Sequence, residues 1–554
     1  MTRGVYKILR NIWAPVVLGA LPVLYMLYRN IVTVFVWELP LPLLVSTALS
    51  IFLFIIFLIS TQNLSAASLI SSLVLIGLYA FGPLKDLLEK LGLTEFKDEA
   101  GFISLLLINL IILLVSFKVL QKKELITKWS FRLNLAVSLL LVLFIAGGVY
   151  RQFDHDHDLK NLGPIVPEQP ALSMDTPNIY YIITNGLGRL DVLKDGYGVD
   201  ISDINNAFKN LGFFVAANSR ANYTDPHASV ASIMNMDFLN DWVAIEGSKN
   251  YSSEILSEAI QYNKIIPIFK KRGYKVVSIS SGRSDIDLIS ADQQSGMSVF
   301  YDDLISLVFK ITPIGFIINE FQLYDWQYRR HRGLILDALK NLPKTTEISG
   351  PKLVIANILS PEPPFIFNHN GTIRSHHVPF GFQDGSNFVG NKRDYMIKYA
   401  EQVRFILSEL INILSHISRK DPFGIIVVQG DHGSGLQYHL NSTKLGDPHE
   451  RLAIFNAYRL GGANPSEVGL DHNSSPVNTF RIILNHAFGM NLPLLESRSY
   501  FSAELKPLSF KEIPESMPRI LTCRPSPSGR VGRIGPECLE PYPKEQGPPS
   551  ATPY

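Results

Sequence analysis

The sequence has little cysteine. Its 554 residues contain two cysteines, Cys523 and Cys538, which both lie near the C-terminal end. A disulfide framework in the rest of the chain is therefore excluded, and only a Cys523–Cys538 bond stays open. A cysteine-free remainder is compatible with an extracytoplasmic protein.

Charged residues are also scarce. They make up 18% of the chain against 47% hydrophobic residues, which is apolar for a soluble protein and predicts that part of it lies in a membrane. The formal net charge is +2, and no basic block stands outside the loops that flank the apolar runs. Nucleic-acid binding is therefore not expected. The sequence shows no internal repeat.

The apolar residues are concentrated near the N-terminus in five runs, each close to the ~20 residues needed to cross a bilayer. No small-residue cleavage site follows the first run, so we expect a retained span and not a signal peptide. Residues 31–37 are a candidate re-entrant or interfacial segment, and buried core helices are the alternative for some runs. The five predicted spans are 13–28, 41–60, 66–81, 101–117 and 133–150.

Basic residues around these runs predict the orientation. Arg3, Lys7 and Arg10 precede the first run, and a cluster of lysines with Arg132 separates the fourth from the fifth. The positive-inside rule then predicts a multi-pass protein of the cell membrane, with a cytoplasmic N-terminus and an extracytoplasmic C-terminal domain. A transporter or channel is the weaker alternative, because Arg29 near the end of a run is the only prominent charge, so the runs resemble an anchor.

The rest of the chain divides by composition. After the transmembrane anchor (1–150), residues 151–177 are polar and contain proline, which predicts a linker. Its acidic and histidine run, 154–158, is either a metal ligand or a solvated cluster. Residues 178–513 form the predicted extracytoplasmic domain, and the Pro- and Gly-rich tail 514–554 is expected to be disordered.

Within 178–513, short apolar strands alternate with segments of helical periodicity. The predicted strands are 178–183, 274–279, 352–359 and 424–429, and the predicted helices include 253–271 and 394–418. This alternation predicts an α/β domain with a mostly parallel sheet and helices on both faces. Ligands bind such sheets at the carboxyl ends of the strands, where Asn185, Glu362 and the turn 430–433 fall.

One of these strand ends offers metal ligands. In IIVVQGDHGSG (425–435), an apolar strand ends in adjacent Asp431 and His432 between glycines. An oxygen and a nitrogen ligand side by side suit a divalent cation such as zinc or manganese. The expectation is therefore one cation, bound weakly or not at all.

Several segments in a consistent order resemble the sulfatase and alkaline phosphatase superfamily, and within it the membrane-anchored bacterial branch with several N-terminal spans. The resemblance covers about 174–512. Its motifs are NIYYIITNGLGRLDVLKDGYGVD (178–200), GFFVAANSRANYTDPHASVASIMNMDFL (212–239), ANILSPEPPFIFNHNG (356–371), GDHGSG (430–435), RLAIFNAYRL (451–460) and SPVNTFRIILNHAFGMNLPLLESRSY (475–500).

The resemblance implies a chemistry built on one or two metal ions. A threonine, serine or formylglycine nucleophile attacks sulfur or phosphorus, and histidines stabilise the departing charge. Matched to the family's pattern, the strand-end carboxylate is replaced here by Asn185, and the nucleophile position falls on Pro226. Proline has neither a hydroxyl nor a backbone N–H, so the fallback nucleophiles are Thr224 and His227, with Ser229 also nearby.

The two family histidines that would bind substrate are here Asn357 and Glu362. Glu362 places a negative charge where a cation should face the leaving group. Asp431 and His432 are kept, and with Asn185 they are the predicted metal set. Four changes together indicate a catalytically impaired domain, because residues that act as a unit are lost as a unit. Such a pseudoenzyme would bind an envelope glycan or lipid head group, or support a partner enzyme.

The alternative is an active metal-dependent sulfuric- or phosphoric-ester hydrolase, or a phospho-group transferase, with a remodelled site. In it, Asp225, His227 and Glu362 join Asp431 and His432 around a cation that carries hydroxide. A simpler interpretation of His227 is an exposed loop residue. Three further histidines lie in a polar loop that either covers the site or is solvated: His369, His376 and His377.

Overall fold

The structure is a computed structural model of the whole chain. It describes residues 3–29, 39–90, 107, 110, 114, 123–158, 176–200, 202–240, 254–283, 285–288, 290–296, 307–308, 311–321, 323, 325–376, 378, 380–504 and 506–516. The predicted re-entrant segment 31–37, nearly all of the fourth predicted span, the tail beyond residue 516 and both cysteines lie outside the described residues.

The chain forms two compact units. The N-terminal unit comprises Met1–Gly163 together with Ser298–Tyr324, and the sheet domain comprises Pro164–Met297 and Asp325–Tyr554. The predicted boundaries assigned 298–324 to the C-terminal domain, whereas here this segment belongs to the N-terminal unit. Within this segment, Leu307 packs against Val23 of the first helix.

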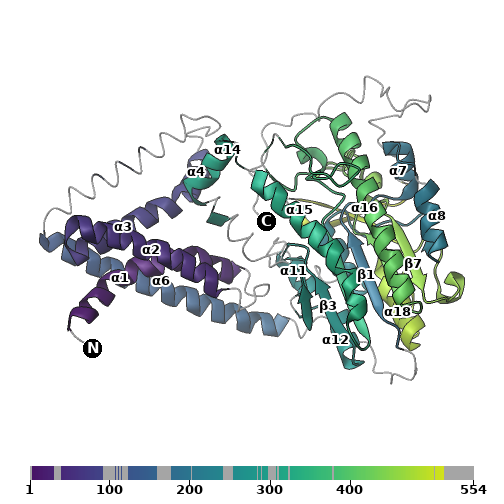
Figure 1. Cartoon of the computed structure of the whole chain (residues 1–554), viewed down its shortest axis with the longest axis horizontal. Coiled ribbons are helices and arrows are strands. Elements are labelled where there is room, and N and C mark those ends of the chain that lie inside the picture. The colour runs from purple at the N-terminus through teal and green to yellow at the C-terminus, as the bar shows by residue number, and fades with distance from the viewer. Residues whose placement is uncertain are drawn as a thin grey trace. The chain divides into compact units, whose positions relative to one another are not determined.

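The N-terminal unit is helical (Figure 1). Three of its helices contain segments long and apolar enough to cross a membrane, namely Tyr6–Tyr25, Pro40–Thr61 and Glu124–Gly147. These match three of the five predicted spans, whereas the predicted span 66–81 is a 16-residue helix, about 24 Å long. Five spans are therefore not confirmed. The helices are α1 (Arg3–Arg29), α2 (Pro40–Thr61), α3 (Leu64–Tyr79), α4 (Phe81–Lys90), α6 (Lys123–Asp158) and α14 (Pro313–Glu320).

Small and polar residues join these helices. A Cβ on Gly19 of α1 would lie 1.7 Å from the Ser50 Oγ of α2, so only glycine allows this approach. The Trp13 indole N–H donates to Ser138 Oγ across α1 and α6 at 3.0 Å. The helix α6 continues to Asp158, so the first eight residues of the predicted linker are helical.

The sheet domain contains a seven-stranded sheet in the order β2-β7-β6-β1-β5-β3-β4. Five strands are parallel, and β7 and β2 continue the sheet at one edge in antiparallel pairings. The four predicted strands and the mostly parallel class are confirmed. The strands are β1 (Ile179–Thr184), β2 (Phe214–Val215), β3 (Lys275–Ile279), β4 (Gln293–Ser295), β5 (Lys352–Ile358), β6 (Ile425–Gly430), β7 (Asn456–Leu460) and a separate hairpin, β8 (Tyr500–Ala503) and β9 (Lys506–Glu512).

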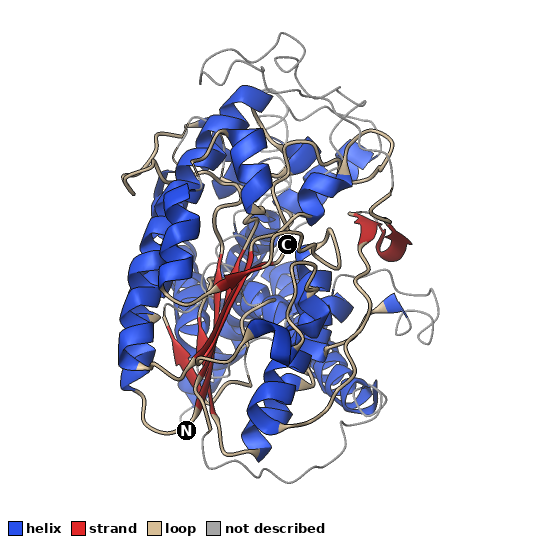
Figure 2. Ribbon diagram, turned by 90° about the vertical axis from the view of Figure 1, so that its right-hand side faces the viewer, coloured by secondary structure: helices blue, strands red, loops and turns tan. Residues whose placement is uncertain are grey.

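Helices lie on both faces of the sheet, as Figure 2 shows. The predicted helix 394–418 is confirmed as α16, whereas 253–271 is interrupted at Asn263, whose side chain accepts hydrogen bonds from the first amides of the second helix. The helices are α7 (Leu190–Tyr197), α8 (Ser202–Asn210), α9 (Pro226–Asn235), α11 (Glu254–Gln261), α12 (Ile265–Lys271), α15 (Asp325–Asn341), α16 (Lys392–Lys420), α17 (Pro448–Leu452) and α18 (Thr479–Phe488).

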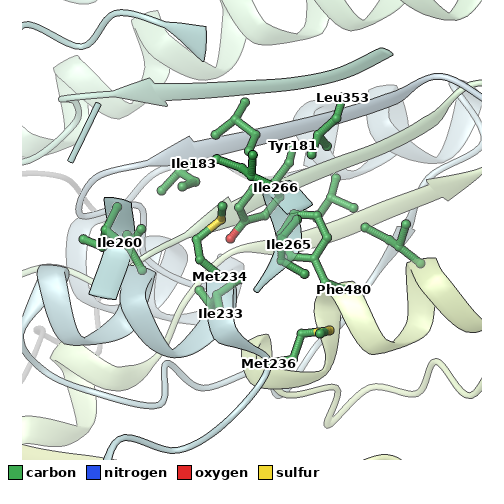
Figure 3. Packing of buried hydrophobic residues seen from close by; sticks show 14 of the residues in the cluster. Tyr181, Ile183, Ile233, Met234, Met236, Ile260, Ile265, Ile266, Leu353 and Phe480 are labelled. Atoms are coloured by element: carbon green, nitrogen blue, oxygen red, sulfur yellow. The ribbon is translucent and has the colours of Figure 1, made fainter. Parts of the chain in front are cut away.

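Strand β1 is the centre of the domain. Every residue of β1 is buried, because alternate side chains point to opposite faces and both faces are covered. On one face, Tyr181 and Ile183 pack with Ile233 and Met234 of α9 and with Ile266 of α12, and Figure 3 shows these side chains. This packing fixes the end of β1, where Asn185 follows.

Candidate functional site

Three strand ends meet at the centre of the sheet. The register places Thr184 of β1 opposite Ile358 of β5 on one side and Gly430 of β6 on the other. Asn185, the loop after β5 and the Asp431-His432 pair therefore begin at the same carboxyl edge. The prediction that this edge gathers them is confirmed.

The Asn185-Gly186 turn is in direct contact with Glu362. The Gly186 N–H donates to Asp431 Oδ1 at 3.0 Å, and Gly186 has a φ of 78°. A Cβ at this position would lie 2.8 Å from the Glu362 Cβ. Only glycine therefore combines this left-handed conformation with so close an approach.

Backbone contacts hold Glu362 in place. Its N–H donates to the Asn185 carbonyl at 3.0 Å, and its own carbonyl accepts from Gln402 Nε2 of α16 at 3.0 Å. The Glu362 Oε2 lies 3.3 Å from His432 Nε2. Burial would raise the pKa of Glu362, but the bond to His432 and the charges of His432, Arg451 and Arg283 hold this pKa below its ordinary value.

The Asp431-His432 pair is fully buried. His432 Nδ1 lies 2.7 Å from the Gly433 carbonyl, so a proton on Nδ1 satisfies that oxygen, and Nε2 faces Glu362 Oε2. Burial and the charge of Glu362 raise the pKa of Asp431. Burial would lower the pKa of His432, but Asp431 and Glu362 together raise it.

Several buried polar atoms at this edge lack hydrogen-bond partners among the described residues. They are Asn185 Oδ1, Asp431 Oδ2 and both amide atoms of Asn357, and they accompany His432 Nε2, which faces Glu362 Oε2 at 3.3 Å. Buried polar atoms are rarely left unpaired, so this cluster fits a ligand that completes it. Two oxygens and one ring nitrogen are donors that a divalent cation accepts.

The cation site is nevertheless poor in charge. Among the residues that the structure describes, no group of three or more His, Cys, Asp or Glu side chains is placed to hold a metal ion. Asn185 contributes a neutral carbonyl oxygen, and Glu362 is paired with His432. Asp431, His432 and Asn185 follow strands that end at the same edge of the sheet, and their role as a metal set stays a prediction.

The nucleophile position is occupied by the start of a helix. Pro226 is the first residue of α9, and Asp225 caps this helix by accepting from the Ala228 N–H at 2.9 Å. The hydroxyls on either side are bonded within the fold. Thr224 Oγ1 accepts from the Ser502 N–H at 3.4 Å, and Ser229 Oγ donates to the Tyr223 carbonyl at 2.9 Å.

His227 belongs to a second cluster at the carboxyl end of β3. Its Nε2 lies 2.7 Å from Asp285 Oδ2 and 3.0 Å from Arg283 Nη2, so the nitrogen that a cation would need is occupied. The expectation of an exposed residue is wrong, because His227 is 4% exposed. Sequence reasoning missed Arg283 and Asp285, although they follow a predicted strand at the same edge of the sheet.

A further histidine next to Glu362 was missed. His331 of α15 is buried, and its Nε2 has no hydrogen-bond partner among the described residues. Burial lowers its pKa to about 4, against the opposing charge of Glu362, so His331 is neutral. In the polar loop, His376 is half-buried and stacks on Tyr328 at 3.4 Å. His369 is exposed, and His377 lies outside the described residues, so whether this loop covers the site stays a prediction.

Arg451 is a buried residue that connects two loops of the sheet domain. Its side chain is buried and pairs with Asp384, and its Nε donates to the Thr224 carbonyl at 3.3 Å. Its guanidinium also lies 5.0 Å from the centre of the Tyr438 ring. Arg451 thereby ties the loop before Pro226 to the loop before α16.

A buried carboxyl lies behind the Asp-His turn. Glu450 accepts hydrogen bonds from the Tyr197 and Ser434 hydroxyls, and its Oε2 is inaccessible to solvent, without a hydrogen-bond partner in the described part of the chain. Burial raises the pKa of Glu450 to about 7. The folded protein therefore keeps this proton at pH values where an unfolded chain releases it.

We expect Glu450→Gln to flatten the pH dependence of stability. Below about pH 4 the carboxyl is protonated in both states, and between about pH 4 and 7 only the unfolded chain ionises, so the contribution of Glu450 to the free energy of unfolding falls with rising pH. At about 1.4 kcal/mol per pKa unit, this contribution is about 3.5 kcal/mol at most. In thermal unfolding from pH 4 to 8, the stability of Glu450→Gln relative to the wild type should therefore rise with pH, whereas the exposed control Glu467→Gln should follow the wild type. An unchanged slope in Glu450→Gln contradicts the assignment.

No family model matches the sequence, and no curated protein matches it. Solved structures do resemble the fold. The C-terminal periplasmic domain of EcEptC from Escherichia coli in complex with Zn is 12% identical, covers 63% of this chain and 96% of its own, and has a TM-score of 0.41. The integral membrane lipooligosaccharide phosphoethanolamine transferase A from Neisseria meningitidis is 13% identical, covers 85% and 95%, and has a TM-score of 0.38.

A putative sulfatase from Bacteroides thetaiotaomicron is likewise 13% identical, covering 60% of this chain and 75% of its own with a TM-score of 0.38. These TM-scores are below 0.5 and the identities below 25%, so the likeness carries no chemistry over to this chain.

Proposed function

We propose that this chain is a membrane-anchored, sulfatase-like protein that has lost covalent group transfer and binds an envelope glycan or lipid head group at the carboxyl edge of its sheet. The domain lies outside the cytoplasm, with the N-terminus inside, as the basic flanks of the first span favour. The observation that carries the proposal is Pro226 at the first position of α9. No hydroxyl can act from that residue, and the neighbouring Thr224 and Ser229 are bonded within the fold.

The same edge supports binding. One divalent cation, held by Asp431, His432 and Asn185, would supply the positive charge that attracts an anionic head group. Asn357 and Ser360 lie at this edge. Their side-chain polar atoms are buried without hydrogen-bond partners among the described residues, and they offer donors and acceptors to the bound group. Glu362 opposes a negative ligand unless its charge is met by His432 or by the cation.

The test compares turnover with binding in the full chain. With zinc or manganese present, we expect no hydrolysis of p-nitrophenyl phosphate or p-nitrophenyl sulfate above that of Asp431→Ala, and no covalent adduct in the intact mass. Inorganic phosphate or sulfate should bind by calorimetry only with the metal, and Asp431→Ala should abolish this binding. The double variant Asn185→Asp with Pro226→Thr restores a carboxylate and a hydroxyl at these two positions. It serves as the positive control for formation of a covalent adduct.

An active enzyme with a remodelled site is the second candidate. The proximity of Glu362 to His432 favours it, since a carboxylate lost at Asn185 is present again on the neighbouring loop. Hydrolysis by the wild type that disappears in both Asp431→Ala and Glu362→Gln would establish this candidate and overturn the proposed function.

A further inference from the structure

An internal segment of the sheet domain leaves that domain and joins the helices near the N-terminus. The chain departs after β4 and returns at Asp325, the first residue of α15, and the segment between, Ser298–Tyr324, is part of the N-terminal unit. Leu307 in this segment packs against Val23 of α1, as do Leu39 and Leu43 at the start of α2. The segment therefore packs against a helix that is apolar enough to span a bilayer.

The second half of this segment exposes large apolar side chains. Ile314 and Ile317 of α14 are exposed, as are Phe321 and Leu323 just after it, and we call these four residues the apolar insertion. Ile314, Ile317 and Phe321 follow helical spacing and so share one face. From Ile311 to Tyr324 the sequence has a single charged residue, Glu320. A patch of this kind marks a surface that is covered by something other than water.

The length and surroundings of α14 identify what covers it. Eight residues of helix extend about 12 Å, which is too short to cross a bilayer but suits a helix at its surface. Trp326 follows two residues after Tyr324, and tryptophan is enriched at the boundary between lipid and water. We propose that the apolar insertion lies in the interfacial layer of the membrane that holds the N-terminal helices, so that the sheet domain has a second attachment to lipid within its own sequence.

This attachment is close to the site along the chain. The helix α15 begins at Asp325 and carries His331, six residues or about 9 Å further along its axis. His331 is the buried neutral histidine that lies near Glu362. Along the chain, less than two helical turns therefore separate the segment Ser298–Tyr324 from a histidine whose pKa is influenced by Glu362.

The experiment measures the depth of spin labels in full-length protein reconstituted into vesicles of phosphatidylethanolamine and phosphatidylglycerol. Both native cysteines are replaced by serine, and single cysteines are introduced by Ile317→Cys, Phe321→Cys or the matched control Phe423→Cys. Phe321 and Phe423 are both exposed phenylalanines, at 68% and 75%, and Phe423 lies in the loop before β6. Ile55→Cys on α2 provides a reference within a span.

Labels at 317 and 321 are expected to collide several-fold more with oxygen than with a water-soluble nickel chelate, as at position 55, and the label at 423 should show the reverse. A label at 321 that is as open to nickel as the label at 423 overturns the proposal. Shielding from both reagents, with broadening between labels, also overturns it, because a second copy of the chain would then cover the insertion.

Discussion

Asn185→Asp is expected to tighten the binding of Zn²⁺ or Mn²⁺ by about 2–4 kcal/mol, which is roughly 30- to 1000-fold. The reason is charge, since a carboxylate about 4 Å from a divalent ion at an effective dielectric of about 20 contributes several kcal/mol. The change replaces the neutral side-chain amide by a carboxylate. Asn185 Oδ1 is buried and has no hydrogen-bond partner among the described residues. Calorimetric titration of the metal-free full chain measures the change directly.

The same variant should lose stability when no metal is present. A third carboxylate near Asp431 and Glu362 adds repulsion in a buried site, so the melting temperature should fall without metal and recover with zinc. Asp431→Ala in the Asn185→Asp background is the control and should bind no zinc. Equal zinc affinity in the wild type and in Asn185→Asp would show that these residues do not share a cation.

Arg451→Ala is expected to lower the free energy of unfolding by about 3 kcal/mol, because it leaves the largely buried Asp384 without its ion-pair partner. The change also removes the bond to the Thr224 carbonyl and the packing over Tyr438. Chemical denaturation of the full chain in detergent gives the difference.

Two comparisons separate the buried charge from other losses. Arg498→Ala breaks an ion pair with Glu496 that is largely exposed and should change stability by less than about 1 kcal/mol. Asp384→Asn combined with Arg451→Met removes both charges and should lose less than Arg451→Ala alone. A loss below about 1 kcal/mol in Arg451→Ala would contradict the role of this residue as a support of the site.

Strand positions were predictable because the central strands are apolar on both faces. IYYIIT, KLVIANI and IIVVQG are near-continuous apolar runs, and parallel strands share one carboxyl edge, so Asn185, Glu362 and Asp431 could be placed together from the sequence. The antiparallel β7, NAYRL, is short and contains Asn456 and Arg459, so it lacks this apolar signal. Its direction depends on the pairing with β6, which no local sequence pattern encodes.

Side-chain partners were less predictable than strands. The sequence indicates an exposed loop position for His227, because its partners, Arg283 and Asp285, lie more than 50 residues away in the chain. His331 lies in a charged stretch, RRHRG, which is typical of a solvated helix face. Only the packing of α15 buries this side chain. The apolar insertion was also missed, since its helix is shorter than any window that detects a span.

The position of β1 at the centre of the sheet has a consequence for synthesis. This apolar strand is made first, yet its neighbours β5 and β6 follow roughly 170 and 240 residues later. At about 5–20 residues per second, the IYYIIT segment waits roughly 10–30 s for β5. An unpaired segment of this composition aggregates readily, so yield should depend on what shields β1 in that interval.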